Sequence, residues 1–516
     1  MKDDDETVPL LGPGESRTGL RFPLQPPSIP DNIFPSGAPT IREEDDFFAV
    51  QRSDFAFVDC RVHDAMPTSA INDRQVTFNI RAFDGPQFLF LNEAVLVMDA
   101  KLVDKDGNVP ANDASIAPIH MFPTTMFRDV RLYLNDTEVS NSEDGAYPMR
   151  AWIETTLNYS REQMTTNQER FAVPMPHYEY TYQHTKKSDT EKNTPKEVIL
   201  SRSFFGSFFP HATEKDDDGK PKKIFKYYDV PMRYFGRVLT NFSNCQRPII
   251  PGVGVRVEMS FARPEFYLIT DSETNLTDKR YHIQVDSVVL AVPYRQMNME
   301  MYYNLGVHLT KNPVLYPMKR MSMKKFTLTK GQQNFTFNDL ATGAKKPDRI
   351  LLAFTPEKWW ENVGTHHPLQ STSVFQTDAE DEPDKTGATT ASMTAARLTV
   401  NALRVDPINS KNWNQLVLGG YHQLIRNLGL ETVYDRAIGF TYQQYARRNF
   451  YLLFDLTQSG RAFDSSVRYA TREGQLRLEV DFDKALPTTV NMFALAEFNA
   501  SVKIDKNRNI TYNFVT

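Results

Sequence analysis

The chain has 516 residues, a formal net charge of -5 and 40% hydrophobic residues, which is enough for two domains that each bury their own core. No apolar run approaches the roughly 18 residues of a membrane helix, and the acidic start, residues 1–6, does not have the pattern of a secretion signal, so we expect synthesis in the cytosol. Only Cys60 and Cys245 are present, which excludes a disulfide framework and predicts two buried or idle thiols unless the fold brings them together.

Residues 1–50 form an acidic, proline-rich tail. They hold ten acidic and four basic residues, a net charge of -6, and eight prolines with little apolar periodicity. Such a segment cannot bury enough surface to offset the entropy of ordering, so we expect it to be flexible when the protein is alone. Its apolar spots, Leu10-Leu11, Phe34 and Phe47-Phe48, are candidate docking points, and the alternative is a solvated leader with no partner. Its charge would repel nucleic acid.

The first half of the chain then alternates apolar and polar residues as strands do. Strands are predicted over residues 74–81, 88–103 and 126–139, the last with a turn at Asn135-Asp136. A short helix follows from Tyr147, and its apolar face consists of Met149, Trp152, Ile153, Thr156 and Leu157. Residues 170–224 have little periodicity and predict a long surface loop.

The second half repeats this order. After a connection over residues 295–315, a hairpin is predicted over 326–337, and a second long loop over 361–396. A helix beginning at Trp413 follows the i, i+3, i+4 rule and stops at Gly429.

The strands downstream of the two helices also match. Residues 251–261 resemble residues 473–482, with Arg256 and Glu258 in the places of Arg477 and Glu479. A second strand follows each, over 285–292 and 490–498. We therefore predict two related all-β domains in tandem.

The search for chemistry gives no catalytic, cofactor-binding or metal-ligating residue, and hence no cofactor. The phosphate-binding, zinc-protease and nucleophile-elbow motifs are missing. His366-His367 has no partner spacing for a metal, and residues 104–107 resemble the start of a calcium loop but are better explained as a turn. Trp359-Trp360 could cover a ligand groove, although packing at a domain or subunit contact is the more common role.

Several stretches together resemble one family. These are residues 130–139 with the helix over 147–159, residues 250–257, residues 450–456 and residues 474–505. In this ensemble the chain resembles the double jelly-roll, hexon-like major capsid proteins of Polinton/Maverick elements and adintoviruses, over roughly residues 55–512. The resemblance implies an all-β fold of two tandem eight-stranded antiparallel jelly rolls, each with an inserted short helix and long loops. The expected domains are the tail 1–50, a first jelly roll 51–297 and a second jelly roll 298–516.

The resemblance also implies a structural function and no enzymatic one. Three chains would form a pseudo-hexameric capsomer, and capsomers would tile an icosahedral shell with penton and minor capsid proteins. The near-neutral body predicts no direct, sequence-specific binding of nucleic acid. We expect the protein in the virion capsid, after synthesis in the host cytoplasm and assembly there or in the nucleus. The alternative is a carbohydrate- or receptor-binding β-sandwich, such as a viral spike or a lectin-like module. An obligate trimer interface is relatively apolar, and its candidate loop residues are Phe204, Phe205, Phe208, Phe209, Trp359 and Trp360.

Overall fold

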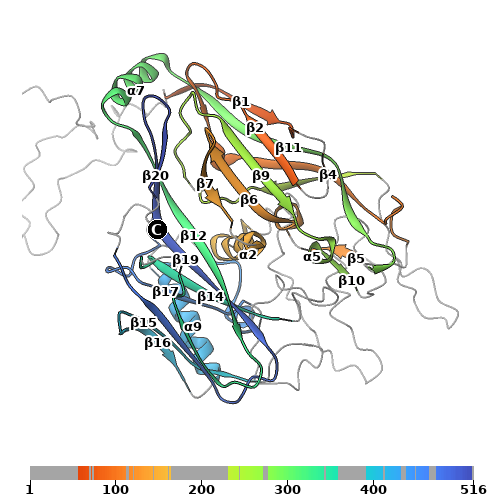
Figure 1. Ribbon diagram of the computed structural model, residues 1–516, viewed down its shortest axis with the longest axis vertical. Helices are drawn as coiled ribbons and strands as arrows, with labels where there is room; N and C mark the ends of the chain where they lie inside the picture. The colour runs from red at the N-terminus through yellow and green to blue at the C-terminus, as the bar shows by residue number, and fades with distance from the viewer. Residues whose placement is uncertain are drawn as a thin grey trace, which may run out of the picture. The chain divides into compact units, whose positions relative to one another are not determined.

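The computed structural model describes residues 56–513 with gaps, of which the largest are 164–229 and 358–390. Shorter gaps fall at 69–70, 72–74, 112–115, 120, 143–144, 161, 243–244, 271–276, 342–344, 411–412, 432–436, 448 and 464–471. The predicted tail and most of both predicted long loops lie outside the described residues. From Val58 onwards the chain forms one compact unit (Figure 1).

The first half of this unit contains two antiparallel sheets. The first sheet has the order β1 (Phe57–Ala65), β11 (His282–Met297), β4 (Val95–Val103) and β8 (Met232–Arg237), with β3 (Gln87–Leu89) added on β11. The second sheet has the order β2 (Gln75–Ile80), β9 (Val255–Phe261), β6 (Phe127–Leu134) and β7 (Thr137–Asn141). Counted in chain order without β3 and without the separate two-stranded ribbon of β5 (Ile116–Pro118) and β10 (Leu268–Thr270), the strands pair as 1-8-3-6 and 2-7-4-5.

The second half repeats this order. One sheet contains β12 (Val314–Leu328), β19 (Val490–Ile504), β14 (Arg349–Pro356) and β17 (Tyr451–Asp455), with β20 (Ile510–Asn513) added on β19. The other contains β13 (Asn334–Asn338), β18 (Leu476–Phe482), β15 (Met393–Val400) and β16 (Leu403–Asn409). The strands again pair as 1-8-3-6 and 2-7-4-5. Two sheets of four strands in this order are a jelly roll, so the predicted fold of two eight-stranded antiparallel jelly rolls is confirmed.

Alternating side chains form each core. In β2, Val76, Phe78 and Ile80 point inward and are almost fully buried, as the sequence predicts. The predicted turn between β6 and β7 is also present, and Asn135 and Asp136 both adopt the positive φ that such a two-residue turn requires.

The sequence repeat corresponds to a structural repeat. β9 and β18 are each the seventh strand of their jelly roll. In β9 the side chains of Arg256 and Glu258 form an ion pair of 3.4 Å, and in β18 Arg477 and Glu479 form one of 2.9 Å. The matched residues thus have the same neighbour in both halves.

Helices connect the strands. Two long helices lie between the fifth and sixth strands of the jelly rolls: α2 (Tyr147–Asn158) in the first and α9 (Trp413–Asn427) in the second. A third, α7 (Met299–Lys311), connects β11 to β12. The shorter elements are η1 (Leu91–Glu93), α1 (Phe122–Thr125), α5 (Pro264–Tyr267), α10 (Tyr442–Arg447) and the ribbon of β5 (Ile116–Pro118) with β10 (Leu268–Thr270). None of the described helices is long and apolar enough to cross a lipid bilayer.

Two predictions of local structure are wrong. Residues 326–337 do not form a hairpin, because β12 pairs with β19 whereas β13 pairs with β18 in the opposite sheet. Apolar and polar residues do alternate on both sides of Gly331, but at this point the chain crosses from one sheet to the other. The second long loop also ends earlier than predicted, because β15 begins at Met393. Cys60 and Cys245 do not form a disulfide; Cys60 is exposed on β1 and Cys245 is buried.

The two ends of the jelly rolls differ. At the end that we call the base lie the β6–β7 turn, the β19–β20 turn (residues 505–509) and α7. At the other end, which we call the loop end, β14 finishes at Pro356 and β8 begins at Met232. At the loop end the chain therefore enters the predicted long loop over 361–396 and leaves the predicted long loop over 170–224.

Candidate assembly surfaces

The six aromatic residues predicted for a trimer interface, Phe204, Phe205, Phe208, Phe209, Trp359 and Trp360, lie outside the described residues, as do His366 and His367. Residues 104–107 form a turn, in which a carboxylate oxygen of Asp104 accepts hydrogen bonds from the backbone N–H groups of Asp106 and Asn108, each at 2.9 Å. In the described part of the chain, no group of three or more His, Cys, Asp or Glu residues could hold a metal ion.

The two jelly rolls meet along the edge strand β12. The segment that follows β8, described at residues 241–242 and 245–251, forms hydrogen bonds with this edge. The Met321 N–H donates to the side-chain oxygen of Asn241 at 3.2 Å, and the Arg247 guanidinium donates to the carbonyl of Leu315 at 2.6 Å. An uncovered edge strand invites pairing with another chain, so this segment protects β12 while it joins the domains.

Tyr316 of β12 contributes the most buried contact of this junction. Its hydroxyl accepts a hydrogen bond from the Ile250 N–H at 3.0 Å and donates one to the Pro248 carbonyl at 3.1 Å, and its side chain is fully buried. Burial raises the pKa of this phenol far above its ordinary value, so the hydroxyl stays protonated. A ring contact with Phe242, with centroids 5.5 Å apart, completes the packing.

The β19–β20 turn joins the jelly rolls at the base. The Arg508 guanidinium donates to the Pro251 carbonyl at 2.6 Å, and the Asn135 side-chain amide donates to the Arg508 carbonyl at 3.2 Å. Gly252 lies directly under this arginine, and an added Cβ would come within 2.9 Å of the guanidinium. The base of the second jelly roll therefore touches the base of the first.

A buried charge cluster lies on the outer face of the β12-β19-β14-β17 sheet. The Glu497 carboxylate is 2.7 Å from a guanidinium nitrogen of Arg349 and 3.4 Å from the ammonium of Lys319. Lys319 also pairs with Asp348 at 3.0 Å. Burial raises the pKa of the Glu497 carboxyl, but the charges of Arg349 and Lys319 outweigh this effect and hold that pKa below its ordinary value.

Helix α2 contributes to the electrostatics of this cluster. Burial lowers the pKa of the Arg349 guanidinium, but nearby carboxylates, first Glu497, then Asp455 and Glu154 of α2, raise it above its ordinary value. Glu154 also forms a 2.8 Å ion pair with Arg150 one turn earlier, and both side chains are almost fully buried. Glu154 therefore places α2 of the first jelly roll beside the sheet of the second.

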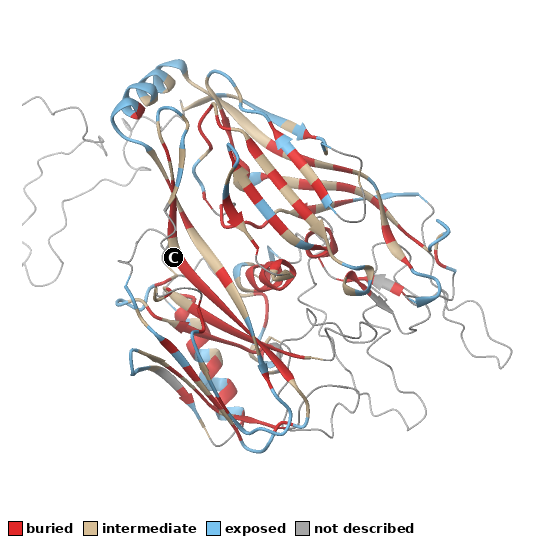
Figure 2. Ribbon diagram, in the orientation of Figure 1, coloured by how far each residue is buried: buried red, intermediate tan, exposed pale blue. Residues whose placement is uncertain are grey.

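The prediction of a single apolar face for α2 is accordingly wrong. Ten of its residues, from Tyr147 to Thr156, are buried, including both charged ones (Figure 2). A helix that is buried all round lies inside a protein and not on its surface. The polar side that the sequence suggests would face solvent is therefore buried in the structure.

The outer face of the equivalent sheet in the first jelly roll is less deeply buried. In register across its strands, Val97 lies between Val289 and Phe235, and the three side chains are only partly buried. By contrast, Leu351, Leu453 and Leu495 occupy such a row in the second jelly roll and are buried. The apolar outer row of the first sheet is thus more exposed than its counterpart.

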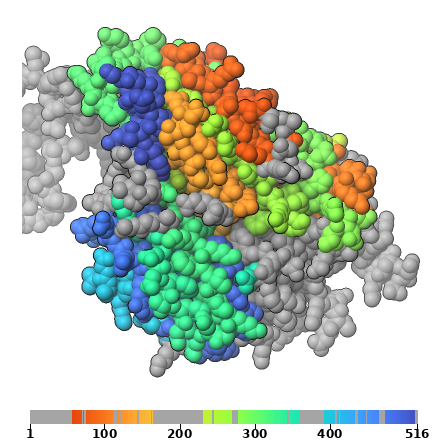
Figure 3. All heavy atoms as spheres, in the orientation of Figure 1, coloured from red at the N-terminus to blue at the C-terminus, as the bar shows by residue number. Residues whose placement is uncertain are grey.

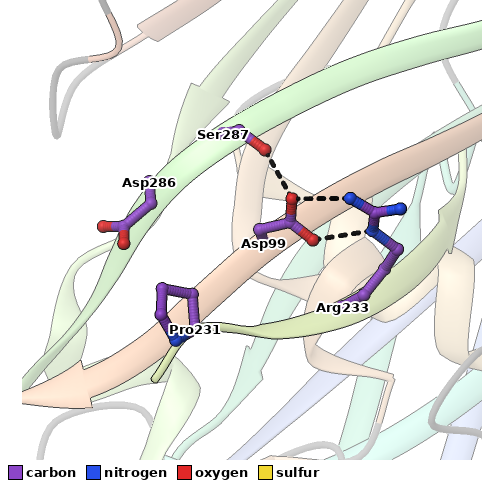
Figure 4. A pocket seen from close by; sticks show the side chains of 5 residues that line it. All are labelled: Asp99, Pro231, Arg233, Asp286 and Ser287. Carbon is purple, nitrogen blue, oxygen red and sulfur yellow. Dashed lines mark hydrogen bonds and ion pairs between the residues drawn. The ribbon is translucent and has the colours of Figure 1, made fainter. Parts of the chain in front are cut away.

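A shallow hollow of about 530 Å³ adjoins this apolar row. Asp99 on its floor accepts two hydrogen bonds from Arg233, at 2.8 and 3.0 Å, and one from Ser287 at 2.8 Å (Figure 4). Asp286 and Pro231 complete its lining. The pair of Asp99 with Arg233 lowers the pKa of the Asp99 carboxyl, so the carboxylate is charged at neutral pH. The Asp99–Arg233 pair thus forms a polar border beside the apolar row that contains Val97.

Helix α9 has the one-sided burial that the sequence predicts. Its buried residues are Trp413, Leu416, Val417, Gly420, Gln423, Leu424 and Asn427. Gly420 lets the helix approach β17, since an added Cβ would come within 3.3 Å of Leu452. On the opposite side Leu418 is 57% exposed, and His422 is exposed one turn further on. Nothing described covers this side of α9.

Helix α7 lies where the sequence predicts only a connection between the two halves of the chain. Asn298 caps the helix, because its side-chain oxygen accepts a hydrogen bond from the Glu300 N–H at 3.0 Å. Met299, Tyr303 and Val307 recur every four residues and are exposed at the base, where α7 lies beside the β19–β20 hairpin (Figure 3). The capping residue Asn298 and the four-residue spacing of these apolar residues are the sequence signals that indicate a helix here.

Comparison with solved structures identifies the fold as the double jelly roll. The chain is similar to the capsid protein in the quasi-atomic model of the PBCV-1 virus capsid, with a TM-score of 0.51, 9% identity and coverage of 91% of this chain and 100% of that one. It is equally similar to a chain of the Sputnik virophage, with a TM-score of 0.51, 10% identity and coverage of 93% and 94%. The mavirus major capsid protein aligns over 97% of both chains at 10% identity, but its TM-score of 0.47 carries no weight.

No protein-family model matches this chain, and no curated protein matches it in sequence. At identities near 10% the structural likeness extends to the fold alone.

Proposed function

We propose that this protein is the major capsid protein of a virus or of a virus-like element, and that three copies form a capsomer with a pseudo-hexagonal outline. The observation that carries the proposal is the fusion of two jelly rolls with identical strand order in one chain. Three chains supply six similar jelly rolls, so a trimer can occupy the place of a hexamer in a shell. Jelly rolls also present few free strand edges. The PBCV-1 and Sputnik structures with this fold are described as virus capsids or virus particles.

The finer assignment is to the hexon-like proteins of Polinton/Maverick elements and adintoviruses. It is supported by the ensemble of sequence stretches named above and by the tandem fold. With it we propose a virion location, penton and minor capsid proteins as partners, and domain limits at 51–297 and 298–516. We further propose that residues 170–224 and 361–392, which the chain enters or leaves at the loop end, contribute to the capsomer surface and to subunit contacts.

The first test is the solution mass of the purified chain, measured by light scattering after size exclusion, with negative-stain images of the main peak. A particle of three times 59.2 kDa with a hexagonal outline is expected. A stable monomer under all salt and pH conditions would contradict the capsomer and favour a carbohydrate- or receptor-binding module. A glycan array would then test that alternative directly.

The aromatic loops give a second test of the same proposal. Replacement of Phe204, Phe205, Phe208, Phe209, Trp359 and Trp360 by Ser should weaken the trimer, because an obligate interface depends on apolar contacts. Unchanged trimers would remove these loops from the interface.

The tail has a separate role in this proposal. Deletion of residues 1–50 should leave trimers intact and impair the binding of an internal minor protein or a later assembly step. Loss of the trimer on truncation would contradict this.

A further inference from the structure

We propose that an exposed apolar stripe on α7 binds the same stripe on a second copy of this chain, in an antiparallel pair of helices that joins one capsomer to the next. The stripe consists of Met299, Tyr303 and Val307. This inference rests on the proposed capsomer and adds a contact outside it. Two identical surfaces that bind each other are related by a twofold axis, so this contact cannot close a ring of three chains.

Helix α7 has two apolar sides, and only one of them holds the helix to the rest of the protein. Tyr302, Leu305 and Leu309 follow the i, i+3, i+7 spacing of one side and are the residues of the helix that are at least partly buried. The Tyr302 ring contacts the Phe88 ring edge-on, with centroids 6.4 Å apart, and Leu309 is 8% exposed. The anchoring of the helix therefore does not use the stripe.

The stripe itself faces solvent at the base. Met299 is 63% exposed, Tyr303 73% and Val307 43%. At 3.6 residues per turn, the three positions span only about 80° of the helix surface, so their side chains are neighbours. Figure 1 shows α7 at a corner of the described unit, beyond the ends of β11 and β12, where another molecule can reach it. A contiguous apolar patch that is not used inside the protein indicates an interaction site.

A glycine beside the stripe is a second, independent observation. Gly306 lies in the middle of α7, where glycine is less favourable than alanine. It does not adopt the positive φ that would require glycine, and an added Cβ would have no neighbouring side chain within 4 Å. The backbone and the packing of the chain therefore do not explain this glycine. A partner helix does, because the missing side chain lets that helix approach closely beside Tyr303.

The charges of α7 favour a second copy of the chain as the occupant. Glu300 lies in the first turn of the helix and Lys311 in the last, and by the helical period both lie on the same flank of the stripe. Neither forms an ion pair within the part of the chain that the structure describes. In an antiparallel pair centred on Tyr303, Glu300 of one copy approaches the partner's Lys311, and the two helix dipoles oppose each other. Opposite charges at the border of a contact fix its orientation.

A lipid surface and an unrelated helix fit this surface less well. An amphipathic helix that lies on a membrane is rich in basic residues on its polar face, whereas α7 carries Glu300 as well as His308 and Lys311. An unrelated helix would not require that the two ends of α7 match each other.

The contact is small, because α7 has only 13 residues. It buries less than the roughly 1,200 Å² of a stable complex, so two isolated capsomers should associate weakly and reversibly. Each trimer carries three copies of α7, and contacts with several neighbours act together in a shell. The association must therefore be measured over a range of concentrations.

Sedimentation velocity of the full chain provides this measurement. Wild-type trimers should form reversible pairs of six times 59.2 kDa as the concentration rises. Tyr303→Arg should weaken this association at least about tenfold and leave the trimer intact, because the two introduced charges meet at the twofold axis. The matched control is Met301→Arg, on the opposite side of the same helix, where the native methionine is 44% exposed. This control should associate as the wild type does.

Charge reversal identifies the partner. Glu300→Lys and Lys311→Glu should each associate poorly alone, because like charges then meet at both ends of the pair. An equimolar mixture of these two variants should recover the association, because every contact between them again joins opposite charges. The double variant Glu300→Lys/Lys311→Glu should recover it as well. Recovery in the mixture also shows that both variants are folded.

The possible outcomes separate this contact from the capsomer. Trimers that never associate, or a mixture of the two charge variants that remains at three times 59.2 kDa, overturn the contact and leave the capsomer intact. Association that Tyr303→Arg does not weaken belongs to another surface and also overturns the contact. A monomeric wild type that still forms pairs sensitive to Tyr303→Arg supports the contact and overturns the capsomer.

Discussion

Replacing Glu497 by Gln should destabilise the protein strongly, because it breaks the charge cluster between the jelly rolls. The Glu497 carboxylate accepts from Arg349 at 2.7 and 2.8 Å and lies 3.4 Å from Lys319, and its side chain is almost fully buried. The amide keeps the size of the side chain but loses the charge. Arg349 would then be left as a buried cation without its main partner.

The expected magnitude follows from this geometry. Removal of one partner of a buried ion pair costs about 3–5 kcal/mol, since the other charge remains desolvated. Two features place the cost at the lower end. Lys319 keeps Asp348 at 3.0 Å, and the amide oxygen of Gln can still accept one hydrogen bond. We therefore expect a loss of about 3 kcal/mol in the free energy of unfolding.

Urea unfolding followed by tryptophan fluorescence measures this loss as a shift of the midpoint at constant slope. The matched control is Asp59→Asn, which removes the Asp59–Arg61 pair of equal length, 2.8 Å, whose side chains are 41% and 68% exposed. The control should lose far less stability than Glu497→Gln, because exposed pairs contribute little. Equal losses in the two variants would refute the idea that burial between the jelly rolls gives the cluster its energy.

Three further outcomes are expected. Tyr316→Phe leaves a buried N–H and carbonyl without their shared partner and should cost about 1–3 kcal/mol in the same urea measurement. Gly429→Ala should lower the thermal midpoint, because φ is +74° and an added Cβ would meet the Phe463 ring at 2.5 Å. Gly419→Ala, on the open side of the same helix, should raise that midpoint slightly. The pKa of Glu497 is depressed below its ordinary value of 4.5, so its contribution is complete above that pH and is lost as the pH falls through the folded pKa. A pH series of urea midpoints should therefore converge for wild type and Glu497→Gln in acid.

The elements that the sequence predicted correctly are those with one side exposed to solvent. Helix α9 has a continuous apolar side, a polar side in solvent and a glycine stop at Gly429, so its period and limits can be read from neighbouring residues. The same holds for β2 and for the Asn135-Asp136 turn. The sequence repeat of Arg256 and Glu258 as Arg477 and Glu479 is also a repeat of ion pairs, because the two residues of each pair lie in the same strand.

The incorrect predictions concern segments whose surroundings come from distant parts of the chain. Arg150 and Glu154 have the charges of a solvated helix face, but both are buried in the structure, where they form an ion pair. The segment after Phe326 has the alternation of a hairpin, but its two strands find partners in β19 and β18, more than a hundred residues away.

The sequence by itself determined the all-β class, the tandem repeat and the place of the helices α2 and α9 in it, because alternation and capping are properties of adjacent residues. The tertiary structure alone decided which outer sheet face is buried and which is only partly buried. That choice depends on contacts such as Arg349 with Glu497, 148 residues apart. Apolar side chains on the outer face of β4 are thus partly buried whereas those of β14 are buried, because the surroundings of each face come from distant parts of the chain.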